Sequence, residues 1–392
     1  MRMISGPLAA GLVTLALAMP AAAQDDEAQT CLPQGPFPGP PEWKSVEQRE
    51  DGRVTFRYCA PEAGSVAVIS DDLPPAVPFG AGLPMTKDAS GLWSATTELV
   101  VAPDTYRYNF RVDGTRTPDP QADRFVAERM GVDTIMEVTG PGGAFQTWQK
   151  DVPHGLVSEI DYWSDTLGLM RRAFVYTPPG YMKGDESYPV LYLVHGATGS
   201  EENWSRVGRA NDIADNLLAA GEAQRMIIVM PDGHTPPRDG APLLTNTDFG
   251  GDLIDDLVPT IDATFRTIAD RDHRAMAGLS MGGAHTLQFG LTRPDLFGSI
   301  GIFSMGLGLQ EADQVSVYEE ANARALATRA ASDDLVYYAM GTEDFLYGTV
   351  APTRAMFDKA GIDHVYNETG GGHDWINWRR YLADFLPRLF QP

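Results

Sequence analysis

Residues 274–283 read RAMAGLSMGG and contain the pattern G-x-S-x-G, centred on Ser280. The residues before the pattern, 274–277, predict a short buried strand, and residues 284–291 predict a helix. A serine on a sharp turn between a strand and a helix is the setting of a nucleophile elbow. The glycines of the pattern allow the backbone to turn tightly. The same turn places the N–H of Met281 at a helix N-terminus, where it can stabilise negative charge.

Strands and helices alternate after about residue 150. Continuous apolar runs predict buried strands at 190–194, 226–230, 299–303 and 335–340. Helical stretches are predicted at 211–220 and 252–265. Apolar strands that alternate with helices indicate a parallel sheet covered on both faces. Together with the elbow, this pattern predicts an α/β-hydrolase domain over residues 150–392.

Residues 43–140 have a different, all-β pattern. Short β-rich segments at 54–58, 65–69 and 106–112 are separated by turn signals such as Asp113-Gly114. This spacing predicts a small immunoglobulin-like β-sandwich domain. The preceding residues, 24–42, are polar and then Pro-rich, which predicts an extended linker.

The charge balance argues against nucleic acid as a partner. The 392 residues carry 30 Lys and Arg against 53 Asp and Glu, a formal net charge of −23. Nucleic-acid binding needs clustered Lys and Arg to displace counterions, and the sequence has no such cluster. We interpret the acidity as a contribution to solubility. The sequence carries no signal for an oligomeric state.

The first 23 residues have the pattern of a secretory signal peptide. Arg2 gives a positive start, residues 8–19 form a short apolar core, and Ala21-Ala22-Ala23 is an A-x-A cleavage site. The apolar core is too short for a membrane span, and no other stretch of the sequence could form one. The pattern predicts cleavage after Ala23 and a secreted or periplasmic protein.

The predicted export affects the expected oxidation state of the two cysteines, Cys31 and Cys59. An exported protein meets oxidising conditions, so a disulfide between them is expected. Two unpaired thiols are the alternative. A metal site is not expected there, because no other Cys or His lies nearby in the sequence.

An activated serine needs a base, and the base needs an orienting acid. In α/β-hydrolases the order along the chain is Ser, acid, His. Asp344 directly follows the predicted strand at 335–340 and is our candidate acid, with Glu343 as the competing residue. His373 follows three glycines, 370–372, and is our candidate base, because its near-neutral pKa suits proton transfer in both directions.

A second oxyanion donor is expected in the loop after the strand at 190–194. The backbone N–H of Ala197 is the candidate, alongside that of Met281, and His195 is interpreted as packing beneath the loop. His234, in the loop 232–240, is a candidate for lining the substrate cleft. The sequence has no H-E-x-x-H motif, Cys/His cluster, phosphate loop or dinucleotide fingerprint. We therefore expect neither a metal nor a cofactor.

These residues resemble the feruloyl esterases of carbohydrate esterase family 1, the esterase D-like branch of the α/β-hydrolases. The resemblance covers about residues 153–390. It is carried by the segments 152–155, 174–181, 193–196, 202–204, 208–217, 272–283 and 371–374.

The resemblance implies a serine esterase that cleaves ferulate or related hydroxycinnamates from plant cell-wall polysaccharide such as xylan. It implies Ser280 as nucleophile, His373 as base and Asp344 as orienting acid. It also implies an oxyanion hole formed by Ala197 and Met281. Feruloylated xylan or its oligosaccharides would be the substrate, with no cofactor.

The N-terminal segment resembles a family 48 carbohydrate-binding module. The resemblance is carried by residues 91–93, 106–108, 112–114 and 118–120. It implies sugar binding, for which Trp93 is a candidate stacking residue, with a role in the aromatic core as the alternative. In the esterase segment, Trp204 and Phe345 are further candidates for substrate contact, and Phe345 would suit an aromatic acyl group.

Other functions share parts of this pattern. Siderophore esterases of the enterochelin type also pair an N-terminal β domain with an esterase D-like hydrolase. Acetyl-xylan esterases and acyltransferases use the same chemistry. A non-catalytic carbohydrate-binding protein on a hydrolase fold is the alternative from a different class, and the presence of a Ser, an Asp and a His in the expected order argues against it.

Overall fold

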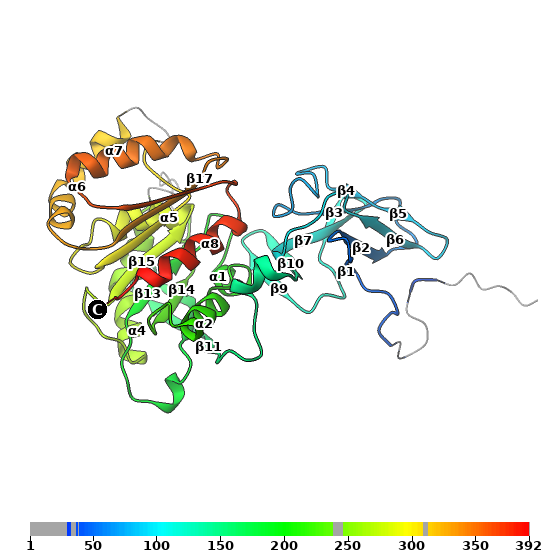
Figure 1. Cartoon of the computed structure of the whole chain (residues 1–392), viewed down its shortest axis with the longest axis horizontal. Helices are drawn as coiled ribbons and strands as arrows, with labels where there is room; N and C mark the ends of the chain where they lie inside the picture. Colours follow the sequence, from blue (N-terminus) through cyan, green and yellow to red (C-terminus); the bar gives the residue numbers. More distant parts are fainter. Residues whose placement is uncertain (1–29, 33–36, 38, 238–245, 309–312, 392) are drawn as a thin grey trace, which may run out of the picture.

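The computed structural model describes residues 30–32, 37, 39–237, 246–308 and 313–391. The predicted signal peptide therefore lies outside the described residues. Figure 1 shows an all-β module followed by a larger α/β domain, joined side by side. The predicted fold class is confirmed: an N-terminal β-sandwich module precedes an α/β-hydrolase-type domain.

The N-terminal module is built from two antiparallel sheets. One has the strand order β1-β2-β6-β5, and the other has the order β4-β3-β7-β10-β9, with β8 paired to β7. The strands are β1 Val46–Gln48, β2 Val54–Cys59, β3 Val66–Ile69, β4 Leu83–Pro84, β5 Thr86–Lys87, β6 Leu92–Thr96, β7 Asp104–Val112, β8 Thr115–Thr117, β9 Phe125–Glu128 and β10 Gly131–Val138. Alternating apolar side chains of both sheets, such as Phe56 and Phe110, meet in one buried core.

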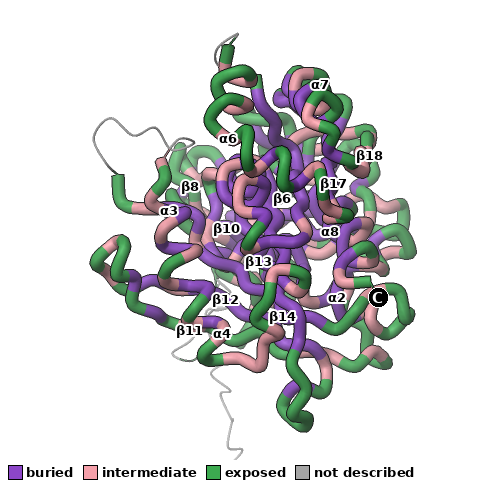
Figure 2. Tube along the Cα trace, turned by 90° about the vertical axis from the view of Figure 1, so that its left-hand side faces the viewer, coloured by how far each residue is buried: buried purple, intermediate pink, exposed green. Residues whose placement is uncertain are grey.

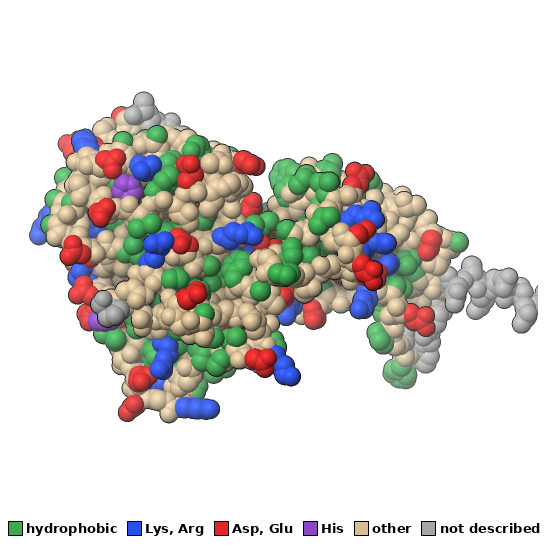
Figure 3. All heavy atoms as spheres, viewed as in Figure 1, with side chains coloured by type: hydrophobic (Ala, Val, Ile, Leu, Met, Phe, Trp, Pro, Cys, Tyr) green, Lys and Arg blue, Asp and Glu red, His purple; other side chains and the backbone are tan. Residues whose placement is uncertain are grey.

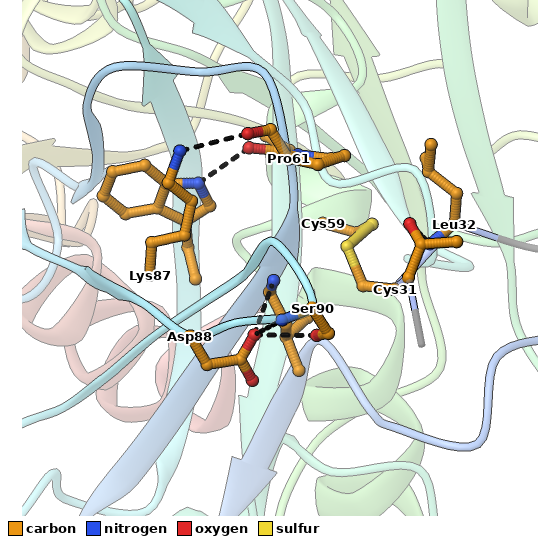
Figure 4. Close-up of a disulfide and its surroundings, with 11 residues drawn as sticks. Cys31, Leu32, Cys59, Pro61, Lys87, Asp88 and Ser90 are labelled. Atoms are coloured by element: carbon orange, nitrogen blue, oxygen red, sulfur yellow. Dashed lines mark hydrogen bonds between the residues drawn. A yellow bond between two sulfur atoms is a disulfide. The ribbon is translucent and has the colours of Figure 1, made fainter. Parts of the chain in front are cut away.

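A disulfide fastens the start of the described chain to this module. Cys31 and Cys59 are joined with an S–S distance of 1.98 Å (Figure 4). The backbone N–H of Cys31 also donates to the carbonyl of Ser90 at 3.0 Å. Part of the segment predicted as a linker is therefore held against the end of β2.

The α/β domain contains an eight-stranded sheet of order β11-β12-β14-β13-β15-β16-β17-β18. Strands β11 and β12 form an antiparallel hairpin at one edge, and the strands from β14 to β18 run parallel. The strands are β11 Leu156–Ser164, β12 Leu169–Thr177, β13 Val190–Val194, β14 Ile227–Pro231, β15 Arg274–Leu279, β16 Ser299–Phe303, β17 Val336–Gly341 and β18 Val365–Thr369.

Helices cover both faces of this sheet, so its central strands are buried on both sides (Figure 2). Helices α2 and α8 pack on one face, and α4, α5, α6 and α7 pack on the other with two π-helical segments, η3 and η4. The helices are η1 Pro141–Gln146, η2 Tyr181–Lys183, α1 Asn203–Arg206, α2 Ala210–Ala220, α3 Asp248–Gly251, η3 Asp252–Leu257, α4 Val258–Thr264, α5 Met281–His285, η4 Thr286–Gly290, α6 Gln314–Ala330, η5 Tyr347–Thr349, α7 Val350–Ala360, α8 Trp375–Phe385 and η6 Leu386–Arg388.

The predicted strands of the parallel sheet lie within two residues of those observed, because each is a continuous apolar run. The helix after the elbow differs from its prediction in form. It begins at Met281 as α5 and continues from Thr286 as the π-helix η4. The β11–β12 hairpin was not predicted, because its exposed face carries Trp163 and Met170 among charged residues and breaks the simple alternation.

The two domains share a packed boundary. Val126 and Ile135 of the module belong to the same buried cluster as helices α2 and α8. Figure 3 shows acidic and basic side chains interspersed over the visible face of the α/β domain. Among the residues that the structure describes, no helix has the length and apolarity needed to cross a bilayer.

The disulfide gives a first prediction. It closes a loop with a sequence separation of 28 residues, so the chain-entropy model predicts a stabilisation of about 3–4 kcal/mol. We expect the double variant Cys31→Ser/Cys59→Ser to lose that amount in the unfolding of the module. Denaturant unfolding measures it, with the reduced wild type as the control. An unchanged unfolding midpoint in both would contradict the prediction.

Candidate active site

The candidate residues follow neighbouring strands of the sheet. Ala197 follows β13, Ser280 follows β15, Asp344 follows β17 and His373 follows β18. These strands are parallel, so their carboxyl ends meet at one edge of the sheet. Open α/β sheets bind their ligands at this edge.

Ser280 has the backbone geometry of a nucleophile elbow. Its φ is 51° and its ψ is −114°, a conformation that costs a side-chain-bearing residue on the order of 1–3 kcal/mol. Its N–H donates to the carbonyl of Phe303 at 2.9 Å, and its carbonyl accepts from the N–H of Ala284 at 2.9 Å. These bonds hold the strained residue between the end of β16 and the first turn of α5.

Two glycines of the G-x-S-x-G pattern are required by close backbone approach. A Cβ on Gly278 would lie 2.4 Å from the carbonyl carbon of Gly282. A Cβ on Gly282 would lie 2.3 Å from the carbonyl oxygen of Val194, at the end of β13. The N–H of Gly282 donates to the carbonyl of His195 at 3.0 Å. The elbow therefore rests directly on the loop that follows β13.

His373 is paired with Asp344. Its Nδ1 lies 2.9 Å and 3.0 Å from the two carboxylate oxygens, and the Asp344 side chain is fully buried. Asp344 Oδ1 also accepts from the N–H of Leu346 at 2.8 Å, which fixes the carboxylate. A carboxylate on Nδ1 keeps the proton on that nitrogen and leaves Nε2 as the basic atom. Glu343, the competing acid, is exposed, so the geometry favours Asp344.

Trp378 on α8 links His373 to the elbow. Its ring lies edge-on to the His373 ring, with centroids 5.0 Å apart. Its Nε1–H donates to the hydroxyl of Ser304 at 2.9 Å, one residue after the carbonyl that holds Ser280. The sequence analysis did not single out Trp378, because only the packing of α8 reveals this contact.

The loop after β13 lies against Ser280. A Cβ on Gly196 would lie 3.6 Å from the Cβ of Ser280. His195 is buried beneath the loop: the N–H of Gly233 donates to its Nε2 at 2.9 Å, which leaves the proton on Nδ1, 2.8 Å from the carbonyl of Gly196. This bond holds the turn that contains Ala197, in agreement with the packing role expected for His195.

His234 is a buried imidazole that lies near the backbone of Ala197. It is 6% exposed, and neither ring nitrogen has a well-formed hydrogen bond to any described residue. Its ring lies 5.3 Å from that of His195. Burial is the main cause that lowers the pKa of His234 to about 4, so the ring is neutral near pH 7. A neutral imidazole can both donate and accept a hydrogen bond.

The other candidates for substrate contact divide sharply by exposure. Phe345 is 76% exposed, and its ring centroid lies 4.4 Å from that of His373. Trp204 is 1% exposed, donates to the carbonyl of Val194 and packs against Trp375, so it contacts the core and not a substrate. The interpretation of Trp204 as a substrate residue is therefore corrected.

Trp93 is likewise a core residue. It is 7% exposed, and its Nε1–H donates to the carbonyl of Ala60 at 2.9 Å. Lys87 lies over its ring, 5.2 Å from the centroid. The ring is thus covered and cannot stack on a sugar, which corrects the stacking interpretation in favour of its alternative.

Two segments of the chain match families of known proteins. Residues 164–389 match the family described as "Putative esterase". The chain belongs to this esterase family. Residues 44–128 match carbohydrate-binding module 48, described as the isoamylase N-terminal domain.

A curated relative covers both domains. It is an endo-1,4-beta-xylanase/feruloyl esterase of Xylanibacter ruminicola, 33% identical over 349 residues and 87% of this chain. The present chain spans 45% of that relative's length. The matched region therefore includes the module as well as the catalytic domain.

Solved structures are similar as well. A ferulic acid esterase has a TM-score of 0.51 and 27% identity, over 60% of this chain and 97% of its own. An enterochelin esterase from Shigella flexneri has a TM-score of 0.63 and 18% identity, over 88% of this chain and 95% of its own. The second likeness concerns the fold, and it extends over both domains.

The His373–Asp344 pair gives a second prediction. Asp344→Asn keeps the size of the side chain but removes the charge that holds the proton on Nδ1 of His373. We expect kcat for an activated ester to fall by about 10⁴-fold, with KM changed much less. Steady-state kinetics measures this, with Glu343→Gln as the matched control. Equal losses in the two variants would contradict the assignment of Asp344.

Proposed function

We propose that the chain is a serine carboxylesterase that hydrolyses feruloyl esters of plant cell-wall polysaccharide such as xylan. The observation that carries the proposal is the His373–Asp344 pair at the same edge of the parallel sheet as the strained Ser280, in a chain 33% identical to a xylanase/feruloyl esterase across both domains. Feruloylated xylan or an oligosaccharide from it would be the substrate.

The proposed mechanism is acyl transfer in two steps. His373 Nε2 takes the proton of the Ser280 hydroxyl as Oγ attacks the ester carbonyl, and the imidazolium returns that proton to the leaving sugar alcohol. The backbone N–H groups of Ala197 and Met281 stabilise the oxyanion. Water, activated by His373, then attacks the acyl-enzyme and releases ferulate.

Two side chains are proposed to contact the substrate. Phe345 is exposed beside His373, and an aromatic ring there suits an aromatic acyl group. His234 is neutral, and its ring nitrogens have no well-formed hydrogen bond to any described residue; it is proposed to hydrogen-bond a hydroxyl or carbonyl of the bound ester. A buried polar group of this kind is costly when unpaired, so it favours a ligand that pairs it.

We also propose that the protein acts outside the cytoplasm. The signal-peptide pattern of residues 1–23 supports this. The Cys31–Cys59 disulfide supports it independently, since disulfides persist in oxidising compartments.

The esterase proposal gives a third prediction. Wild type is expected to hydrolyse methyl ferulate with a higher kcat/KM than p-nitrophenyl acetate, and Ser280→Ala to lose essentially all turnover of both. Loss of the nucleophile of such a triad costs on the order of 10⁶-fold in kcat. Ser316→Ala is the matched control, because Ser316 is exposed on α6.

The same assay separates the competing functions. Turnover of acetyl-xylan but not methyl ferulate would replace the feruloyl substrate by an acetyl one. Turnover of a tri-catecholate siderophore ester alone would favour the enterochelin-type alternative. Absence of turnover of any ester would refute the enzyme proposal.

Phe345 gives a fourth prediction. If its ring packs against the acyl group, Phe345→Ala should raise KM for methyl ferulate severalfold, about 1 kcal/mol of lost contact. The acetyl ester has no aromatic acyl group, so its KM should change little. Tyr347→Phe, a nearby change that keeps the ring, is the control. An equal effect on both esters would show that Phe345 supports His373 instead.

A further inference from the structure

The outer edge of strand β9 is paired with the loop that carries Ala197. Strand β9, Phe125–Glu128, is an edge strand of the module, bonded to β10 on one side only. One residue after the strand, the N–H of Arg129 donates to the carbonyl of Thr198 at 2.9 Å. The carbonyl of Ala127 accepts from the hydroxyl of Ser200 at 2.6 Å. Backbone groups that an edge strand leaves unpaired are thereby used by the esterase domain.

A side-chain relay strengthens the same contact. Glu128 Oε1 accepts from Nδ2 of Asn203 at 2.8 Å and from the guanidinium of Arg107 at 2.8 Å. Arg107 is in turn paired with buried Asp72 at 2.7 Å. Charge-assisted bonds of this kind are stronger than neutral ones, so the module presents Asn203 with a fixed acceptor.

Asn203 in turn contacts the loop that contains Ala197. Its Oδ1 accepts from the N–H of Ser200, and a Cβ on Gly199 would lie 2.9 Å from that oxygen. The N–H of Gly199 donates to the carbonyl of Gly196 at 3.1 Å. Ala197 is therefore enclosed in a turn that is held at one end by His195 and at the other by contacts to the module.

The helix that begins after His373 is attached to the module as well. Arg379 on α8 is fully buried. It pairs with Asp104 at 2.6 Å and donates to the carbonyls of Thr105 in β7 and Val207 in the esterase domain. The loop that contains Ala197 and the helix that follows His373 thus both contact the module.

From these contacts we infer that the N-terminal module is a structural part of the oxyanion hole, with Glu128, Asn203 and Ser200 as positioning residues for Ala197. Their role is exerted through the loop and does not require contact with substrate. The inference rests on the proposed ester hydrolysis but not on the feruloyl group. Oxyanion stabilisation depends on donor placement to within a fraction of an ångström, so loosening the loop lowers kcat.

The test uses full-length point variants and two small esters, methyl ferulate and p-nitrophenyl acetate, which carry no sugar. Glu128→Ala is expected to lower kcat for both about tenfold, with KM unchanged within about twofold. Glu128→Gln keeps an acceptor for Asn203 and should recover most of that loss. Ser200→Ala, a smaller change, should lower kcat about threefold. Thermal unfolding establishes that each variant is folded at the assay temperature.

Glu47→Ala is the matched control, because Glu47 pairs with Arg57 on the exposed surface of the module. It should match wild type in every measurement. Wild-type kcat in folded Glu128→Ala and Ser200→Ala would overturn the inference, as would a loss confined to KM. If Glu128→Ala does not fold, the kcat of Ser200→Ala decides. Poor turnover of methyl ferulate alone would count against the feruloyl proposal, because p-nitrophenyl acetate still reports on the loop.

Discussion

The backbone contact between the elbow and the loop after β13 is the constraint on which the site depends. Gly282 lies so close to Val194 that no side chain fits between them, and its N–H bonds the carbonyl of His195. This contact places the loop that contains Ala197 against the elbow that contains Ser280 and Met281, the residues of the proposed oxyanion hole. One packing contact thereby supports both the strained serine and the proposed oxyanion hole.

The buried sheet provides the rigidity that this contact needs. Strands β13, β15, β16, β17 and β18 are parallel neighbours, so the loops that follow them are held at fixed spacing. Asp344 and His373 follow the last two strands and meet through two short contacts. Trp378 then couples His373 to Ser304, beside the carbonyl that restrains Ser280. The sheet thus fixes both ends of the proposed proton-transfer path from Ser280 to Asp344.

The sequence was sufficient to predict the features of the fold that depend on a local pattern of residues. Continuous apolar runs located the parallel strands, and G-x-S-x-G located the turn, because both are properties of contiguous residues. Which aromatic side chains are exposed could not be predicted from the local sequence. Trp204 and Trp93 are chemically suited to contact sugars, yet tertiary packing covers both, while Phe345 remains exposed. Composition cannot distinguish these cases, since burial is decided by elements distant in the sequence.

The largest non-local feature is the boundary between the domains. The contacts of Glu128 with Asn203 and of Asp104 with Arg379 join residues 75 and 275 positions apart. Neither pair belongs to a motif, so periodicity gave no reason to connect them. A module that only tethered a polysaccharide would need no buried ion pair with the helix that follows His373. Val126 and Ile135 of the module are buried in the same apolar cluster as α2 and α8. Opening the boundary would expose them to water, which argues that this boundary is a fixed part of the folded esterase and not a flexible junction.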